Sequence, residues 1–103
     1  MEEIGGLKVF ARVIITRVMP DNVERAIRVS REQIGDARIQ RGFKGFYLLI
    51  DRDTGKVMTI SLWESADDAR AVEAGAAQVR QEAASNLNTA IPAVDVYEVA
   101  IRA

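Results

Sequence analysis

Six side chains in this sequence have the chemistry to bind or activate a small molecule, and three of them lie close together. The only tryptophan, Trp63, ends an apolar run in which Thr59 and Ser61 stand four and two residues earlier. Alternate residues of a β-strand point to the same face, so these three side chains share a face if the run is a strand. A large ring beside two hydroxyl groups is suited to the floor of a small-ligand pocket. The alternative is a core tryptophan whose indole N–H finds a nearby carbonyl.

The other three candidates are Arg12, Tyr47 and Tyr97. Arg12 is a charge on an otherwise apolar stretch. It could clamp an anionic or phenolate oxygen, or form a structural ion pair with Glu98 near the end of the chain. Each tyrosine could donate a hydrogen bond to a ligand or relay a proton, although tyrosines in strands more often bridge the core and its rim.

Missing residue types restrict the chemistry further. The 103 residues include no cysteine and no histidine. This composition excludes disulfides, thiolate metal sites, a cysteine nucleophile, a Ser-His triad and histidine-ligated haem or zinc. We therefore predict a protein without a metal and without a resident cofactor.

The charges and apolar runs restrict the partners. Fourteen basic and fifteen acidic residues give a net charge of −1, and no basic stripe is interleaved with aromatic residues, so nucleic acid is not an expected partner. The apolar runs are far too short to span a bilayer. The acidic start, MEEIGG, lacks the features of a signal peptide. We expect a cytoplasmic protein with no membrane partner.

The order of the expected elements is strand, helix, hairpin, helix, strand. A strand over 7–17 is followed by a helix of roughly 20 residues, with a capping box from Asp21 to Glu24 and a C-terminal stop at Gly42. Two β-rich runs within 45–64 flank a turn in which Gly55 can adopt positive φ. Ser65 caps the second helix, whose stripe of small residues runs from Ala69 to Leu87, and a last strand follows Pro92.

This order predicts one α+β domain over residues 7–103, preceded by a tail at 1–6. It is the ferredoxin-like β-α-β-β-α-β sandwich, with a four-stranded antiparallel sheet and two helices on one face. Both faces of every expected strand are largely apolar, for example Tyr47 and Leu49 on one face and Phe46, Leu48 and Ile50 on the other. We predict that the second face pairs with a second copy of the chain, giving a homodimer that closes into an α/β barrel.

Three stretches carry a resemblance to a known family: RGFKGFYLL, TISLWESADDA and VDVYEVAIR. They resemble the turn into strand two, the end of strand three and the closing strand of antibiotic-biosynthesis-monooxygenase-like domains, in the dimeric α/β-barrel superfamily. The resemblance covers residues 7–102 and implies a pocket between the sheet and the helices of each subunit. Trp63 matches the tryptophan that lines this pocket in two groups of enzymes.

Each of these two groups of enzymes uses a residue that this chain lacks. One oxidises aromatic phenols with oxygen and no cofactor, using an asparagine four residues before the tryptophan; here that position is Thr59. The other degrades haem bound to a histidine of helix two, and this chain has no histidine. The first expectation from the resemblance is therefore a homodimeric domain that is either non-catalytic or a small-molecule binder, with a ligand-binding or stress-associated role and a pocket that is small or filled. The alternative is a cofactor-independent monooxygenase that acts on a small aromatic molecule.

Overall fold

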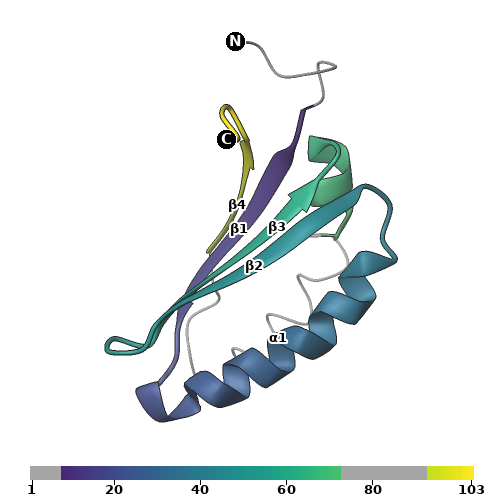
Figure 1. Cartoon of the computed structure of the whole chain (residues 1–103). Coiled ribbons are helices and arrows are strands. Elements are labelled where there is room, and N and C mark those ends of the chain that lie inside the picture. Colours follow the sequence, from purple (N-terminus) through teal and green to yellow (C-terminus); the bar gives the residue numbers. More distant parts are fainter. Residues whose placement is uncertain (1–7, 73–92) are drawn as a thin grey trace.

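The computed structural model describes residues 8–72 and 93–103 of the chain. Its elements are β1 (Phe10–Arg17), one turn of 3₁₀ helix (Pro20–Asn22), α1 (Val23–Arg38), β2 (Phe43–Asp51), β3 (Lys56–Trp63), a second helix described over 66–72, and β4 (Ala93–Glu98). The strands form one sheet in the order β2-β3-β1-β4, and every pairing is antiparallel (Figure 1). This is the ferredoxin-like arrangement, so the predicted α+β fold is confirmed.

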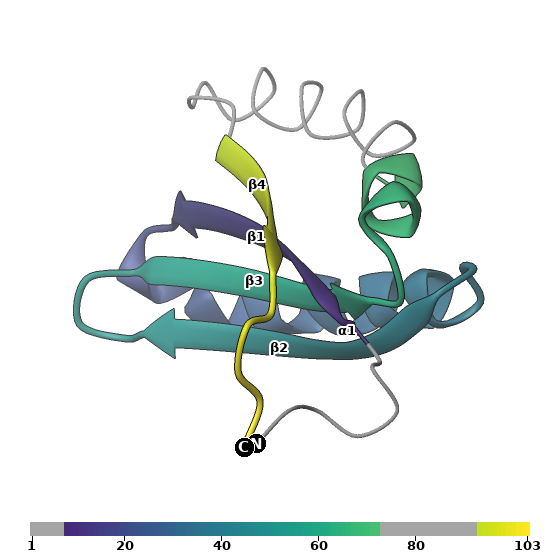
Figure 2. The same cartoon turned by 90° about the horizontal axis from the view of Figure 1, so that it is seen from above.

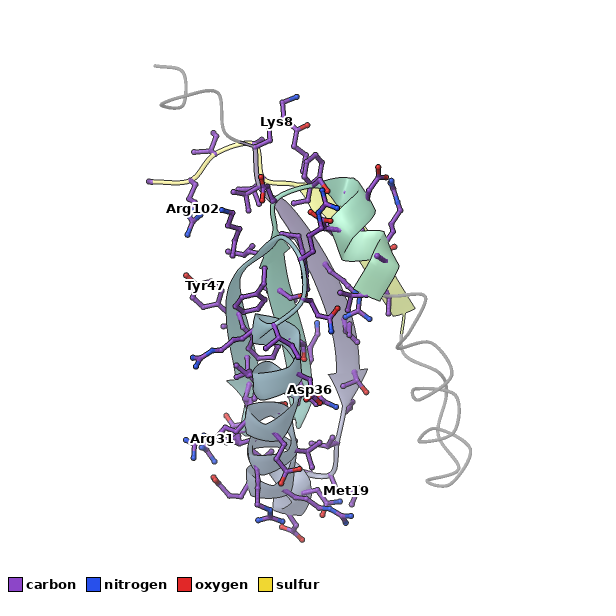
Figure 3. All side chains as sticks on the ribbon, turned by 90° about the vertical axis from the view of Figure 1, so that its right-hand side faces the viewer. Lys8, Met19, Arg31, Asp36, Tyr47 and Arg102 are labelled. Atoms are coloured by element: carbon purple, nitrogen blue, oxygen red, sulfur yellow. The ribbon has the colours of Figure 1, made fainter. Side chains whose placement is uncertain are left out.

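The two helices lie on the same side of the sheet. Figure 2 shows α1 running along the far side of the sheet, beneath β2 and β3. In Figure 3, which looks from the helix side, α1 and the helix at 66–72 both stand in front of the strands. The packing of α1 against the sheet is mainly with β2. One side of the sheet is therefore covered by helices, as predicted; we call it the helix face, and the other the open face.

The strand register assigns each side chain to one of these two faces. Residues directly opposite each other in a sheet point the same way, and Ser61 stands opposite both Arg12 and Phe46. The helix face therefore carries the alternating set that includes Arg12, Phe46, Thr59, Ser61 and Trp63. The open face carries the other set, which includes Ala11, Val13, Ile15, Tyr47, Leu49, Met58, Ile60, Leu62, Asp95 and Tyr97.

The start of α1 differs from the prediction. No side chain caps the helix: Asp21 lies within the 3₁₀ turn, and Asn22 occupies the N-cap position without a side-chain hydrogen bond. Pro20 has a fixed φ and begins a tight turn, which is closed by the Asn22 N–H donating to the Met19 carbonyl at 2.7 Å. The predicted capping box of Asp21 and Glu24 is therefore wrong.

The end of α1 also comes earlier than expected. The helix has 16 residues and ends at Arg38. Gly42 does adopt the predicted left-handed conformation, with φ of +82°, but only after a turn at 39–41. A side chain at this position would collide with Asp68 at the start of the second helix. Gly42 thus allows the chain entering β2 to pass close to the second helix.

The predicted hairpin turn and the cap of the second helix are confirmed. Gly55 has φ of +77°. The Asp51 carboxylate accepts hydrogen bonds from the N–H groups of Thr54 (3.3 Å) and Asp53 (3.0 Å), and these bonds lower the pKa of Asp51 below its ordinary value. At the next junction the Ser65 hydroxyl accepts a hydrogen bond from the Asp68 N–H at 3.0 Å.

Two sequence-based predictions fall outside the described residues: the tail at 1–6, and most of the small-residue stripe of the second helix. The described part of that stripe begins with Ala69, which is fully buried. No helix within 8–72 or 93–103 is long and apolar enough to cross a membrane.

Candidate functional site

Trp63, at the end of β3, is almost completely buried, with 1% of its surface exposed. Its indole N–H donates a 2.9 Å hydrogen bond to the Ser61 hydroxyl, so the acceptor is a side chain two residues earlier and not a main-chain carbonyl. The ring of Phe43 packs edge-on against the indole, with the centroids 5.7 Å apart and the planes at 81°. An irregularity in β2 between Phe43 and Gly45 accompanies the pairing of Phe43 with Trp63.

This arrangement satisfies Trp63 within the subunit. Its single polar atom has a partner, and edge-to-face aromatic pairs of this kind add about 0.5–1.5 kcal/mol beyond the burial of their area. Ser61 is also buried, at 5% exposure. The pair has the character of core packing, with the indole N–H directed at Ser61 and not at a ligand.

Arg12 and Thr59 share the helix face with this pair. Arg12 is 6% exposed, and the register places Ser61 on one side of it and Val96 on the other. Glu98, the acid considered as a partner, stands opposite Phe10, on the same face as Arg12 and diagonal to it. Thr59 is half-buried between Ile14 of β1 and Leu48 of β2. Four of the six candidates therefore lie on one face: the alternation of β3 predicts this for Thr59, Ser61 and Trp63, and the register between β1 and β3 adds Arg12.

The two tyrosines lie on the open face. Tyr47 is 54% exposed and Tyr97 is 53% exposed, and Tyr47 belongs to the edge strand β2 (Figure 3). The sheet stands between these phenols and Trp63. Within one subunit, the tyrosines and the indole therefore do not meet at a common site.

A cavity of about 420 Å³ lies between α1 and β2. Its floor is three alternate residues of β2, and its roof is one face of α1. The lining residues are Ile27, Ser30, Arg31, Ile34, Phe46, Leu48, Ile50 and Arg52. None of the six candidates is among them. The sequence signal was present in the alternation of β2 and in Ile27 and Ile34, two turns apart on a helix, but that pattern indicates core packing equally well.

The polar groups of the cavity are concentrated at its rim. Arg52, at the hairpin end, forms a 2.6 Å ion pair with Glu24 in the first turn of α1, and both side chains are largely exposed. Arg31 is also exposed, and no acid pairs with it in the described part of the chain. The interior is lined by half-buried apolar side chains. This composition suits an apolar molecule that keeps a polar group near the opening.

Over 8–72 and 93–103, no group of three or more acidic, histidine or cysteine residues is placed to hold an ion.

No protein-family model matches the chain, and no curated protein matches it. Solved structures share its fold. A haem-degrading protein of Mycobacterium tuberculosis superposes with a TM-score of 0.69 at 16% identity, covering 94% of this chain and 97% of that one. A monooxygenase of Streptomyces coelicolor, solved in complex with nanaomycin D, gives a TM-score of 0.64 at 18% identity, with 94% and 89% covered.

A third similar structure is a cofactor-independent oxygenase of Streptomyces nogalater, with a TM-score of 0.57, 18% identity, and 94% and 95% of the two chains covered. These identities are low, and a fold alone does not specify an activity. The chain has the ferredoxin-like fold that these monooxygenases and haem-degrading proteins share.

Proposed function

We propose that this chain is a homodimeric domain of the antibiotic-biosynthesis-monooxygenase-like type that binds a small apolar molecule between α1 and β2. The observation that carries the proposal is the cavity of about 420 Å³. Ligand pockets commonly have volumes of about 300–1,000 Å³ and a mainly apolar lining with few polar groups.

The partial exposure of the residues that line the cavity supports a ligand-binding site over a mere defect in core packing. Ile27, Ile34, Phe46, Leu48 and Ile50 are all only half-buried, although a helix and a sheet meet there. Apolar surface left in water costs about 25 cal/mol per Å². A ligand that fills the cavity would remove this surface from water without moving the backbone.

The homodimer is supported by the open face. Ile15, Tyr47, Leu49 and Tyr97 are 43–54% exposed there, beside half-buried Met58 and Ile60. A patch of large apolar side chains on an uncovered sheet face is typical of an interaction surface. A second copy presents the same patch, so a twofold pairing of sheets covers both at once.

Oxygenase activity is the second candidate function. The fold shared with a cofactor-independent oxygenase favours it. Thr59 stands where the resemblance implies an asparagine, and Trp63 already donates its indole N–H to Ser61. For these reasons binding without catalysis is our first proposal.

A matched pair of variants tests the binding site. Leu48 lines the cavity and Leu49, its neighbour in β2, lies on the open face. We expect Leu48→Trp to fill the cavity and abolish binding of the neutral fluorescent probe N-phenyl-1-naphthylamine. Leu49→Trp adds the same bulk on the other side of the sheet and should leave binding intact. Equal binding by both variants would place the site elsewhere and refute the proposal.

A further inference from the structure

We infer that the ligand of the cavity between α1 and β2 is an apolar organic acid, whose anionic group is held by Arg31. This inference rests on the proposed binding function and specifies the chemical class of the ligand. It starts from the polar side chains of the lining, which are Ser30, Arg31 and Arg52. Two of these three are cationic, and no carboxylate is among the described residues that line the cavity.

The two arginines differ in what they have available for a ligand. Arg52 is engaged by Glu24 at 2.6 Å, so the charge at that end of the cavity is largely balanced. Arg31 has no acidic partner among the described residues. The uncompensated positive charge of the lining is therefore at Arg31, near the middle of α1.

The position of Arg31 would orient a ligand, with its apolar part under α1 and its charged group at the opening of the cavity. Ile27, Ser30 and Ile34 are spaced at three and four residues and form the face of α1 over β2. Arg31, four residues after Ile27 and three before Ile34, belongs to the same face, and its side chain is exposed. Figure 3 shows it on the side of α1 away from β1. A ligand under the helix would thus place its acidic group at the rim.

The guanidinium group suits this role. It is planar and always charged, and its donors match the two oxygens of a carboxylate or sulfonate. The half-buried Ser30 hydroxyl is a neighbouring donor. The net charge of the whole chain is −1, so a general positive field does not explain a preference for anions. Any such preference must come from the local charge at the cavity.

Two probes with nearly the same aromatic body test the inference: the anionic 8-anilino-1-naphthalenesulfonate and the neutral N-phenyl-1-naphthylamine. We expect Arg31→Gln to weaken binding of the anion about tenfold and to leave the neutral probe unchanged. Arg28→Gln is the control, because Arg28 is an exposed arginine of α1 that does not line the cavity. The loss of anion affinity caused by Arg31→Gln should be smaller in about 1 M salt than in about 0.1 M salt, because salt screens the charge.

The outcomes separate the inference from the function on which it rests. If wild-type protein binds both probes and Leu48→Trp binds neither, the site is the cavity. If Arg31→Gln then fails to weaken the anion selectively, or Arg28→Gln weakens it equally, the ligand class is wrong and the binding function stands. If wild-type protein binds neither probe, or Leu48→Trp still binds both, the proposed site is wrong and the inference fails with it.

Discussion

Ser61 has a single described role, which is to accept the hydrogen bond of the Trp63 indole. Both residues are buried, so removing the acceptor leaves an N–H group without a partner in a place that water does not reach. An unsatisfied buried donor costs about 1–3 kcal/mol. The hydroxyl at position 61 therefore contributes to stability through Trp63.

We predict that Ser61→Ala lowers the free energy of unfolding by about 1–3 kcal/mol, measured by urea denaturation followed by circular dichroism. Thr59→Val is the matched control, because Thr59 lies on the same face of β3 and its hydroxyl makes no hydrogen bond with the indole. We expect the control to change stability by less than about 1 kcal/mol. Equal losses in the two variants would show that the bond to Trp63 is unimportant.

A second prediction at this scale concerns the pH dependence of the hairpin turn. Hydrogen bonds from Thr54 and Asp53 lower the pKa of Asp51 from its ordinary value of 3.8. The folded state thus favours the charged carboxylate. Its contribution is complete above the ordinary pKa and is lost as the pH falls through the lowered value.

The amide protons of Asp53 and Thr54 should therefore shift together in an NMR titration, with a midpoint below 3.8. In Asp51→Asn this transition should disappear, because an amide side chain does not titrate. A midpoint at or above the ordinary value would contradict the hydrogen bonds described here.

How much the sequence reveals about a single residue depends on whether the residue's own segment, or contacts with other elements, determine its structural role. The alternation of β3 correctly places Thr59, Ser61 and Trp63 on one face. It cannot distinguish a tryptophan that lines a pocket from one that fills a core, because the difference lies in what the other elements bring against the ring. Here Phe43 comes from another strand, through an irregularity in β2 beside Gly45; a glycine within a strand is compatible with such an irregularity but does not indicate which side chain it brings against the indole.

At the scale of elements, Gly55 ties the hairpin to the end of β1. Its carbonyl accepts a hydrogen bond from the Val18 N–H at 2.9 Å, and its φ is +77°. A Cβ atom at this position would overlap the carbonyl oxygen of Val18. Both the backbone conformation and the space therefore require glycine.

We predict that Gly55→Ala destabilises the protein by at least about 2 kcal/mol, since the left-handed conformation alone costs about 1–2 kcal/mol for residues with a side chain. Gly45→Ala is the control: its added Cβ would meet the end of the Leu62 side chain at 3.4 Å, an ordinary contact. We expect the control to change stability by less than about 1 kcal/mol. Thermal denaturation compares the two, and similar losses would contradict the requirement at Gly55.

The boundaries of helices and turns could likewise be predicted only where one or two neighbouring residues determine them. Gly55 and Ser65 were predictable because a positive φ and a helix cap are set by one or two residues. The start of α1 was not, because Pro20 favours a tight turn that competes with the capping box and moves the N-cap to Asn22. The cavity depends on the distance between α1 and β2, which neither segment encodes alone.

At the scale of the whole molecule, the open face is an apolar surface that a single subunit leaves exposed to water. We predict a homodimer in solution and expect Leu49→Asp to convert it to a monomer, because a charge would be buried without a partner at the centre of the paired sheets. Light scattering coupled to size-exclusion chromatography measures the mass.

The control for this prediction is Val29→Asp. Val29 is also an exposed apolar residue, at 42%, but it belongs to α1 and not to the open face. Its variant should remain dimeric. A wild-type mass of one chain, or a Leu49→Asp variant that stays dimeric, would rule out pairing through this face.

The packing of α1 mainly on β2 has a practical consequence for studies of this protein. The cavity lies under that helix, whereas the only tryptophan is enclosed elsewhere by Ser61 and Phe43 and does not line the cavity. The intrinsic emission of the indole should therefore respond to unfolding and remain silent when a non-absorbing ligand occupies the cavity. A spectroscopic screen that relies on that signal would miss true ligands, so a reporter must be introduced on α1 or carried by the ligand itself.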